Sequence, residues 1–190
     1  MSRKPRKKPK PRLSATLYVA DKKRAAIGQL ESAILLWFNE GDPISILLLA
    51  TNAHDCYHAL GKNIGKPSWH QEFMNNMPSS LGERAKYIQD FAKHGSMDLD
   101  ESAQFDTNYA EGLMLISIGC HSEIFGRKTP LMALYWARMF SERPTWTGEA
   151  AQRFPKVVSD DRIIEDVARG SRKQFFDSFY TFFREAYRLL

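Results

Sequence analysis

The sequence predicts an all-α protein, a helical bundle of about five core helices followed by a C-terminal helical extension rich in aromatic residues. Three observations lead to this prediction. Apolar residues recur at steps of three and four through most of the chain, which is the spacing of one helix face. A capping residue followed by proline occurs twice, and this pair is typical of a helix start. No run of strand length alternates between apolar and polar residues.

The first two predicted helices form a hairpin. Residues 21–39 carry one apolar stripe, formed by Ile27, Leu30, Ile34, Trp37 and Phe38. Asp42 and Pro43 then supply a cap and a first helical residue, and Gly61 supplies a stop, which predicts a second helix over about 43–60. Because residues 40–42 alone separate the two helices, we expect them to pack as an antiparallel pair.

Capping signals also predict the third helix. Ser80 and Glu83 have the spacing of a capping box, and the apolar stripe that follows them ends at Gly95. The preceding residues, 62–78, contain Gly and Pro at three positions and are expected to form a loop with at most a short helix near 71–76.

The fourth and fifth helices follow from similar signals. Asp106 or Thr107 caps a segment over 109–125 that is apolar nearly all round, so we expect this helix at the centre of the bundle. Gly126 ends it. A Thr-Pro pair then opens a fifth helix over about 130–141.

Four segments are expected along the chain, namely a basic arm over 1–20, the bundle over 21–144, a connector over 145–159 and the C-terminal extension over 160–190. The extension has seven aromatic residues among its last 16, and they are Phe175, Phe176, Phe179, Tyr180, Phe182, Phe183 and Tyr187. Such a density either packs back on the bundle or forms a surface for a protein partner or a second copy of the chain.

Charge is distributed unevenly along the chain. There are 27 Lys and Arg against 22 Asp and Glu, but residues 1–12 hold seven basic side chains and no acidic one. Residues 13–190 therefore carry 20 positive and 22 negative charges. Nucleic acids are bound mostly through neutralisation of their phosphates, so the arm is the expected nucleic-acid-binding segment. Its basic residues are Arg3, Lys4, Arg6, Lys7, Lys8, Lys10 and Arg12.

The arm also allows other interpretations. It has three prolines and no apolar anchor, so we expect it to be extended. This composition fits three roles, namely nonspecific attachment to RNA or DNA, attraction to an acidic protein or a membrane surface, and that of a solvated tail.

The hydropathy pattern excludes a membrane-spanning segment. The longest apolar run, residues 44–50, is seven residues long, whereas a helical span needs about 20. No secretory signal is apparent, so we expect a cytoplasmic protein. Cys56 and Cys120 form no CxxC pair and are interpreted as buried thiols rather than a disulfide framework.

His54 and His58 are four residues apart on the second helix, which is the geometry of many helical metal ligands. Residues that would complete such a site are His94, His121, Cys120 and Glu123. The chain has no HExxH motif, and hydrogen-bonded structural histidines explain the same spacing, so we expect no metal. Nucleotide-binding and hydrolase motifs of the GxxxxGK[ST], GxGxxG and GxSxG types are also missing, and no cofactor is expected.

Residues 90–94, Asp-Phe-Ala-Lys-His, at the end of the third helix resemble a motif of a family of uncharacterised bacterial all-helical proteins. The similarity spans about residues 22–146 and includes the stretches 26–34, 39–45 and 129–136. This ending is similar to that of HEPN-like helical domains, some of which are metal-independent ribonucleases.

The resemblance implies three candidate catalytic residues. His94 would be a general acid or base, Lys93 would hold a phosphate, and Asp98 follows in an acidic loop. Active HEPN nucleases place an Arg shortly before this His, but here Arg84 lies ten positions before His94. We therefore predict a non-catalytic, HEPN-like binding protein; the alternatives are a HEPN-type ribonuclease, a metal-dependent enzyme, and a protein interaction module that uses the C-terminal aromatic helix.

Overall fold

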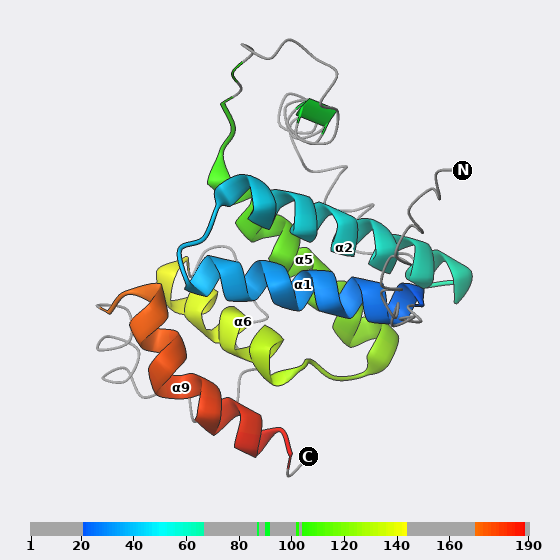
Figure 1. The fold of residues 1–190 in the computed structure, drawn as a ribbon. Coiled ribbons are helices and arrows are strands. Elements are labelled where there is room, and N and C mark those ends of the chain that lie inside the picture. Colours follow the sequence, from blue (N-terminus) through cyan, green and yellow to red (C-terminus); the bar gives the residue numbers. More distant parts are fainter. Residues whose placement is uncertain are drawn as a thin grey trace, which may run out of the picture.

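The computed structural model describes residues 21–66, 87, 90, 91, 102, 104–143 and 170–188. These residues form helices and no strand, so the predicted all-α class is confirmed (Figure 1). The helices are α1 (Lys22–Phe38), α2 (Pro43–Asn63), α5 (Thr107–Phe125), α6 (Pro130–Glu142) and α9 (Arg172–Ala186).

Helices α1 and α2 lie side by side and run in opposite directions, as the short connection predicts (Figure 1). The Asp21 side chain caps α1 by accepting the Arg24 N–H at 2.7 Å. The Asp42 side chain caps α2 by accepting the Ser45 N–H at 2.8 Å, and Pro43 follows at the first helical position. Both starts match the local capping chemistry of the sequence.

The predicted end of α2 at Gly61 is wrong, because the helix continues to Asn63. The glycine is needed for packing rather than for termination. A Cβ atom at Gly61 would lie 3.2 Å from the Lys66 carbonyl oxygen, which folds back over the helix end. The left-handed backbone typical of a helix stop occurs at Gly65, where φ is +67°.

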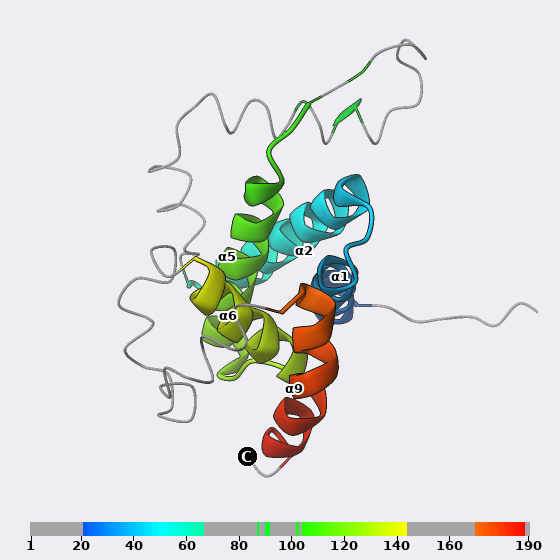
Figure 2. The same ribbon diagram turned by 90° about the vertical axis from the view of Figure 1, so that its left-hand side faces the viewer.

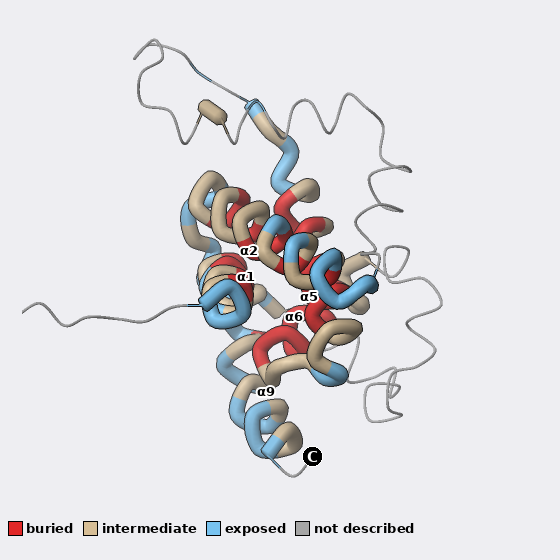
Figure 3. Tube along the Cα trace, turned by 90° about the vertical axis from the view of Figure 1, so that its right-hand side faces the viewer, coloured by how far each residue is buried: buried red, intermediate tan, exposed pale blue. Residues whose placement is uncertain are grey.

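Helices α5 and α6 follow the predicted capping signals, although α5 begins at Thr107, before the predicted segment over 109–125. Asp106 caps α5, and Gly126 ends it with a φ of 81°. Thr129 caps α6 through its side-chain oxygen, with Pro130 at the first position, and α6 ends at Glu142. Buried residues gather where α1, α2, α5 and α6 face one another, whereas α9 is mostly half-buried or exposed (Figure 3). The largest fully buried side chains are Tyr57, Tyr135, Phe38, Leu30, Ile34, Leu47, Leu113, Met114, Ile118, Met132 and Leu134.

Helix α9 packs on α6 and α1 and runs past the rest of the bundle at its C-terminal end (Figure 2). Its start is a capping box, in which the Ser171 side chain accepts the Gln174 N–H and the Gln174 side chain accepts the Ser171 N–H. The aromatic extension therefore does pack back on the bundle, with Phe175 buried. Phe182 stays 53% exposed.

Several predictions concern residues outside the described part of the chain. Of the predicted third helix, residues 87, 90 and 91 are described, and these are helical. The basic arm, the loop helix near 71–76 and the connector over 145–159 lie outside, so the segment boundaries stay predictions. In the part of the chain that the structure describes, no helix is long and apolar enough to cross a membrane. The cytoplasmic location stays a prediction.

Candidate functional site

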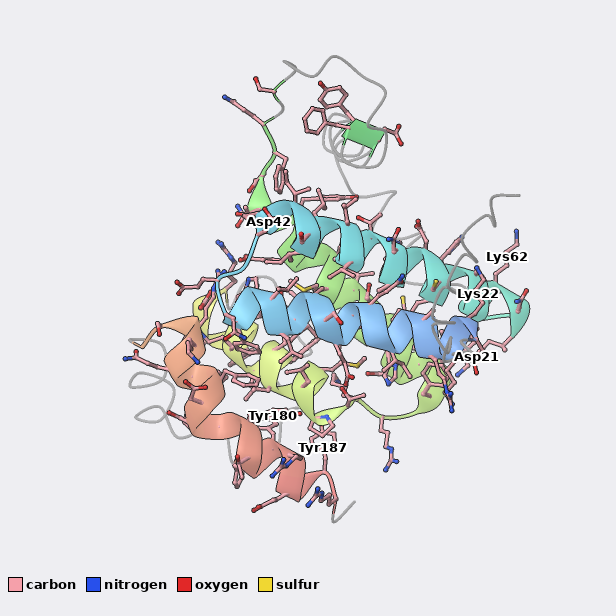
Figure 4. All side chains as sticks on the ribbon, viewed as in Figure 1. Asp21, Lys22, Asp42, Lys62, Tyr180 and Tyr187 are labelled. Atoms are coloured by element: carbon pink, nitrogen blue, oxygen red, sulfur yellow. The ribbon has the colours of Figure 1, made fainter. Side chains whose placement is uncertain are left out.

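Seven basic side chains lie at the end of the bundle where α1 begins, α2 ends and α5 turns into α6. We call this group the basic end, and it consists of Lys22, Lys23, Arg24, Lys62, Lys66, Arg127 and Lys128. The antiparallel hairpin brings Lys22 and Lys62 together, although 40 positions separate them in the chain (Figure 4). All but Lys128 are exposed, and Lys128 is half-buried.

Contacts with neighbouring helices hold three lysines of the basic end. Lys23 places its Nζ 4.6 Å from the centre of the Phe125 ring at the end of α5. Lys128 places its Nζ 5.0 Å from the Trp136 ring, and burial lowers the pKa of its ammonium group. Lys66 donates a hydrogen bond to the Glu123 carbonyl oxygen. These three positive charges therefore sit on side chains that neighbouring residues hold in place.

Few acidic groups offset this charge. Among the described residues of these three segments, the carboxylates are those of Asp21 and Glu123. Asp21 caps α1, so its carboxylate is engaged by the Arg24 backbone N–H. Chain continuity also joins the predicted arm to this end, since residue 20 precedes Asp21 by one peptide bond. The seven basic residues of 1–12 thus precede the basic end in the sequence by fewer than ten residues.

A buried pair of polar rings lies beneath the basic end. The Tyr57 hydroxyl on α2 and Nδ1 of His121 on α5 are 3.0 Å apart, and both side chains are buried. Burial, together with the charges of Lys23 and Lys128, lowers the pKa of His121 from 6.5 to about 4, although a hydrogen bond with the Arg127 backbone opposes this shift. Burial and the charge of Glu31 raise the pKa of Tyr57 above its usual range. At neutral pH both groups are therefore uncharged, and the hydroxyl and the imidazole ring share this hydrogen bond.

The two metal-ligand candidates point into different surroundings. His54 is buried at 3% exposure, with Nδ1 3.8 Å from Oδ1 of Asp55, and His58 is half-buried. Of the proposed additional ligands, Cys120 is buried, and His121 hydrogen bonds to Tyr57. Within the described residues, no group of three or more His, Cys, Asp or Glu side chains is placed to hold a metal ion. The expected absence of a metal stays a prediction.

The catalytic candidates His94, Lys93 and Asp98, and Arg84 with them, lie outside the described residues. The same holds for all seven basic residues of the arm. Of the motif over 90–94, Asp90 and Phe91 are described, and both are helical and half-buried. The catalytic role of these candidates therefore stays a prediction.

A second polar cluster fixes α9 to the bundle. Glu111 of α5, whose side chain is 4% exposed, accepts hydrogen bonds from Trp37 Nε1 at 2.9 Å and from Arg172 at 2.7 Å. Arg143 Nε lies 3.3 Å from the other Glu111 oxygen. The Arg172 guanidinium stacks on Trp37, with its carbon 3.9 Å from the ring centre. One buried carboxylate thus connects α1, the end of α6, and α9, and we call this group the Glu111 cluster.

A third arginine reinforces the start of α9. Arg138 Nε donates to Glu142 at 2.6 Å, and its other nitrogen donates to the Gly170 carbonyl oxygen at 2.8 Å. The Glu142 carboxylate also lies 3.4 Å from Arg172. Because these carboxylates and guanidinium groups engage one another, the cluster is suited to holding the helix rather than to acid–base chemistry.

Sequence reasoning missed both the basic end and the Glu111 cluster. The basic end combines three segments that are far apart in the sequence, and acidic residues between them offset their charge in any average along the chain. The Glu111 cluster had a signal, since a carboxylate within a helix that is apolar nearly all round must be paired when buried.

Comparisons with protein-family models, curated protein sequences and solved structures find no match to this chain.

Proposed function

We propose that the protein binds nucleic acid without cleaving it, through phosphate contacts made jointly by the arm over 1–12 and the basic end. The arm supplies seven basic side chains, and the basic end supplies another seven on a folded surface. RNA and DNA share the phosphate chemistry that these groups recognise. The HEPN-like identity of the bundle and the role of His94 stay predictions, and the proposal does not depend on them.

The observation that carries the proposal is the segregation of charge in the folded body. Residues 13–190 have two more acidic than basic side chains, yet seven basic side chains and two carboxylates lie in the segments that form the basic end. A cluster of like charges repels itself, so it destabilises the fold unless an anion binds. Binding of a polyanion would relieve this repulsion, which explains why the charges are clustered.

The composition of the basic end favours contacts with the phosphate backbone over reading of bases. Five of its seven cationic groups are lysines, which act as compact point charges. Arginine, whose planar fork reads guanine edges, contributes Arg24 and Arg127. Binding is therefore expected to be salt-sensitive and largely independent of sequence.

The test measures fluorescence anisotropy with labelled duplex and single-stranded RNA and DNA. One variant, Lys22→Gln, Lys62→Gln and Arg127→Gln, removes three exposed charges from the basic end. The control, Lys173→Gln, Arg184→Gln and Arg188→Gln, removes three exposed charges from α9. Because each phosphate contact contributes several-fold to the affinity at moderate salt, we expect a loss of about tenfold or more in the first variant. Equal affinities of the two variants would refute the role of the basic end.

The role of the arm is tested by deletion of residues 1–12. The deletion should weaken binding strongly and leave the thermal unfolding midpoint unchanged, because the arm has no apolar anchor. Unchanged affinity would exclude the arm. Binding of the wild type to anionic lipid vesicles but to no nucleic acid would overturn the proposal as a whole.

A further inference from the structure

The turn between α5 and α6 carries two charges of the basic end, those of Arg127 and Lys128. Gly126, with a φ of 81°, donates its N–H to a carbonyl oxygen of α5 at 2.8 Å. Lys128 lies over a tryptophan ring of α6, and Thr129 caps α6. The side chain of Arg127 is exposed, and its backbone forms a hydrogen bond with the His121 imidazole. His121 therefore helps to hold the residue that presents an exposed guanidinium at this turn.

The His121 ring is itself fixed by two other rings. Its Nδ1 lies 3.0 Å from the Tyr57 hydroxyl of α2, and its centre lies 4.8 Å from the centre of the Phe125 ring. The rings of Tyr57 and Phe125 also meet edge to face, with their centres 6.5 Å apart. His121 is 4% exposed, and Tyr57 is completely buried. The imidazole thus connects the packed interface of α2 and α5 to the backbone of the basic turn.

We propose that His121 is a positioning residue for phosphate binding, because it fixes the backbone of Arg127 and thereby the direction of its guanidinium. The imidazole is too deeply buried to touch a phosphate, so it acts through Arg127. A guanidinium binds phosphate through two parallel N–H···O bonds, and this geometry depends on the direction in which the side chain leaves the backbone. The inference rests on the proposed function, since Arg127 contributes only if nucleic acid binds at the basic end.

The chemistry of the ring pair favours this role over one in packing alone. A hydrogen bond between two buried side chains adds little net stability, and apolar groups of the same shape can replace both partners at little cost. Phenylalanine at positions 57 and 121 would fill nearly the same space. Packing of α2 on α5 therefore does not require the polar atoms of His121, whereas the hydrogen bond with the Arg127 backbone does require them.

Fluorescence anisotropy with labelled duplex and single-stranded RNA and DNA tests the inference at about pH 7.5, where the imidazole is uncharged. His121→Phe keeps a ring against Phe125 and removes both hydrogen bonds of the imidazole. We expect an affinity loss of about threefold or more and a salt dependence shallower by up to about 0.9, the value of one phosphate contact. His121→Gln has an amide that both donates and accepts, so it should restore the affinity to within about twofold of the wild type.

A double-mutant cycle shows whether His121 acts through Arg127. In the Arg127→Gln background, His121→Phe should cause no further loss of affinity, because the guanidinium that His121 positions is gone. The matched background is Lys62→Gln, which removes an exposed charge in the last turn of α2. There, His121→Phe should cause its full loss. Equal losses in the two backgrounds would overturn the inference, and so would wild-type affinity of Arg127→Gln alone.

A second variant separates positioning from stability. His121→Phe leaves the buried Tyr57 hydroxyl without its His121 partner, whereas Tyr57→Phe with His121→Phe removes both polar groups. The double variant should unfold at a higher urea concentration than His121→Phe and should bind nucleic acid just as weakly. Affinity that returns together with stability would overturn the inference.

The same measurements distinguish failure of the inference from failure of the proposed function. A wild type that binds none of the probes would overturn the proposed function and the inference with it. A wild type that binds, together with a His121→Phe variant of equal affinity, would overturn the inference alone.

Discussion

Replacement of Glu111 with glutamine tests whether the Glu111 cluster holds α9 on the bundle. The carboxylate is 4% exposed and receives Trp37 Nε1 at 2.9 Å, Arg172 at 2.7 Å and Arg143 at 3.3 Å. Glutamine retains one acceptor oxygen but removes the negative charge. Arg172 and Arg143 would then each lose their ion pair with residue 111 in a partly desolvated site, while Glu142 would remain 3.4 Å from Arg172.

The expected loss follows from the exposure of the two arginines. Breaking a fully buried ion pair by removing one partner costs about 3–5 kcal/mol. Arg172 is 29% and Arg143 is 36% exposed, so both retain some hydration, and we expect Glu111→Gln to lower the free energy of unfolding by about 2–3 kcal/mol. Glu142→Gln, at a carboxylate that is 20% exposed, is the control and should cost less.

Urea denaturation followed by circular dichroism measures both variants, with an unchanged m-value as the condition for comparing them. A double-mutant cycle of Glu111→Gln with Arg172→Met should give a coupling energy of about 1–2 kcal/mol. A loss below about 0.5 kcal/mol for Glu111→Gln, or a coupling energy near zero, would show that the cluster does not fix α9.

Three further predictions concern the fold. The pKa of His121 falls from 6.5 to about 4 on folding. Its contribution to the free energy of unfolding is therefore complete above pH 6.5 and is lost as the pH falls towards 4. At about 1.4 kcal/mol per pKa unit, this contribution is about 3 kcal/mol. In urea denaturation, His121→Gln should lose less free energy of unfolding than the wild type when the pH is lowered to about 4. Equal losses in the two proteins would contradict this prediction. Asp42→Ala removes the cap of α2 and should cost about 1 kcal/mol in the same assay, against no change for Glu40→Ala. Ser117→Ala removes a buried hydroxyl that has no hydrogen-bond partner among the described residues, so the thermal midpoint should stay or rise, and a marked fall would contradict this prediction.

Local chemistry made much of the fold predictable. The starts of α2 and α6 follow from Asp42 with Pro43 and from Thr129 with Pro130, because a cap acts within one turn and needs no tertiary context. Gly61 shows the limit of this reasoning. Its lack of a side chain serves the return of the chain at Lys66, which a helix-stop rule does not take into account.

The candidate site could not be predicted in the same way. The basic end combines charges from the start of α1, the end of α2 and the turn before α6. The net charge of residues 13–190 is −2, so it gives no sign of this local positive cluster. The spacing of His54 and His58 is that of metal ligands, yet the sequence predicts no metal. It gives no sign that Tyr57, which lies between them on α2, meets His121 across the helix interface. Such pairings depend on how helices pack, and helix periodicity does not specify the rotation of one helix against another.

The salt dependence of nucleic-acid affinity tests the central claim most directly. The logarithm of the association constant falls linearly with the logarithm of salt concentration, with a slope of about −0.7 to −0.9 per phosphate contact. The Lys22→Gln, Lys62→Gln and Arg127→Gln variant should therefore have a slope shallower than that of the wild type by about 2–3, and the matched α9 variant should keep the wild-type slope. Identical slopes for all three proteins would contradict the claim that the basic end contacts phosphate.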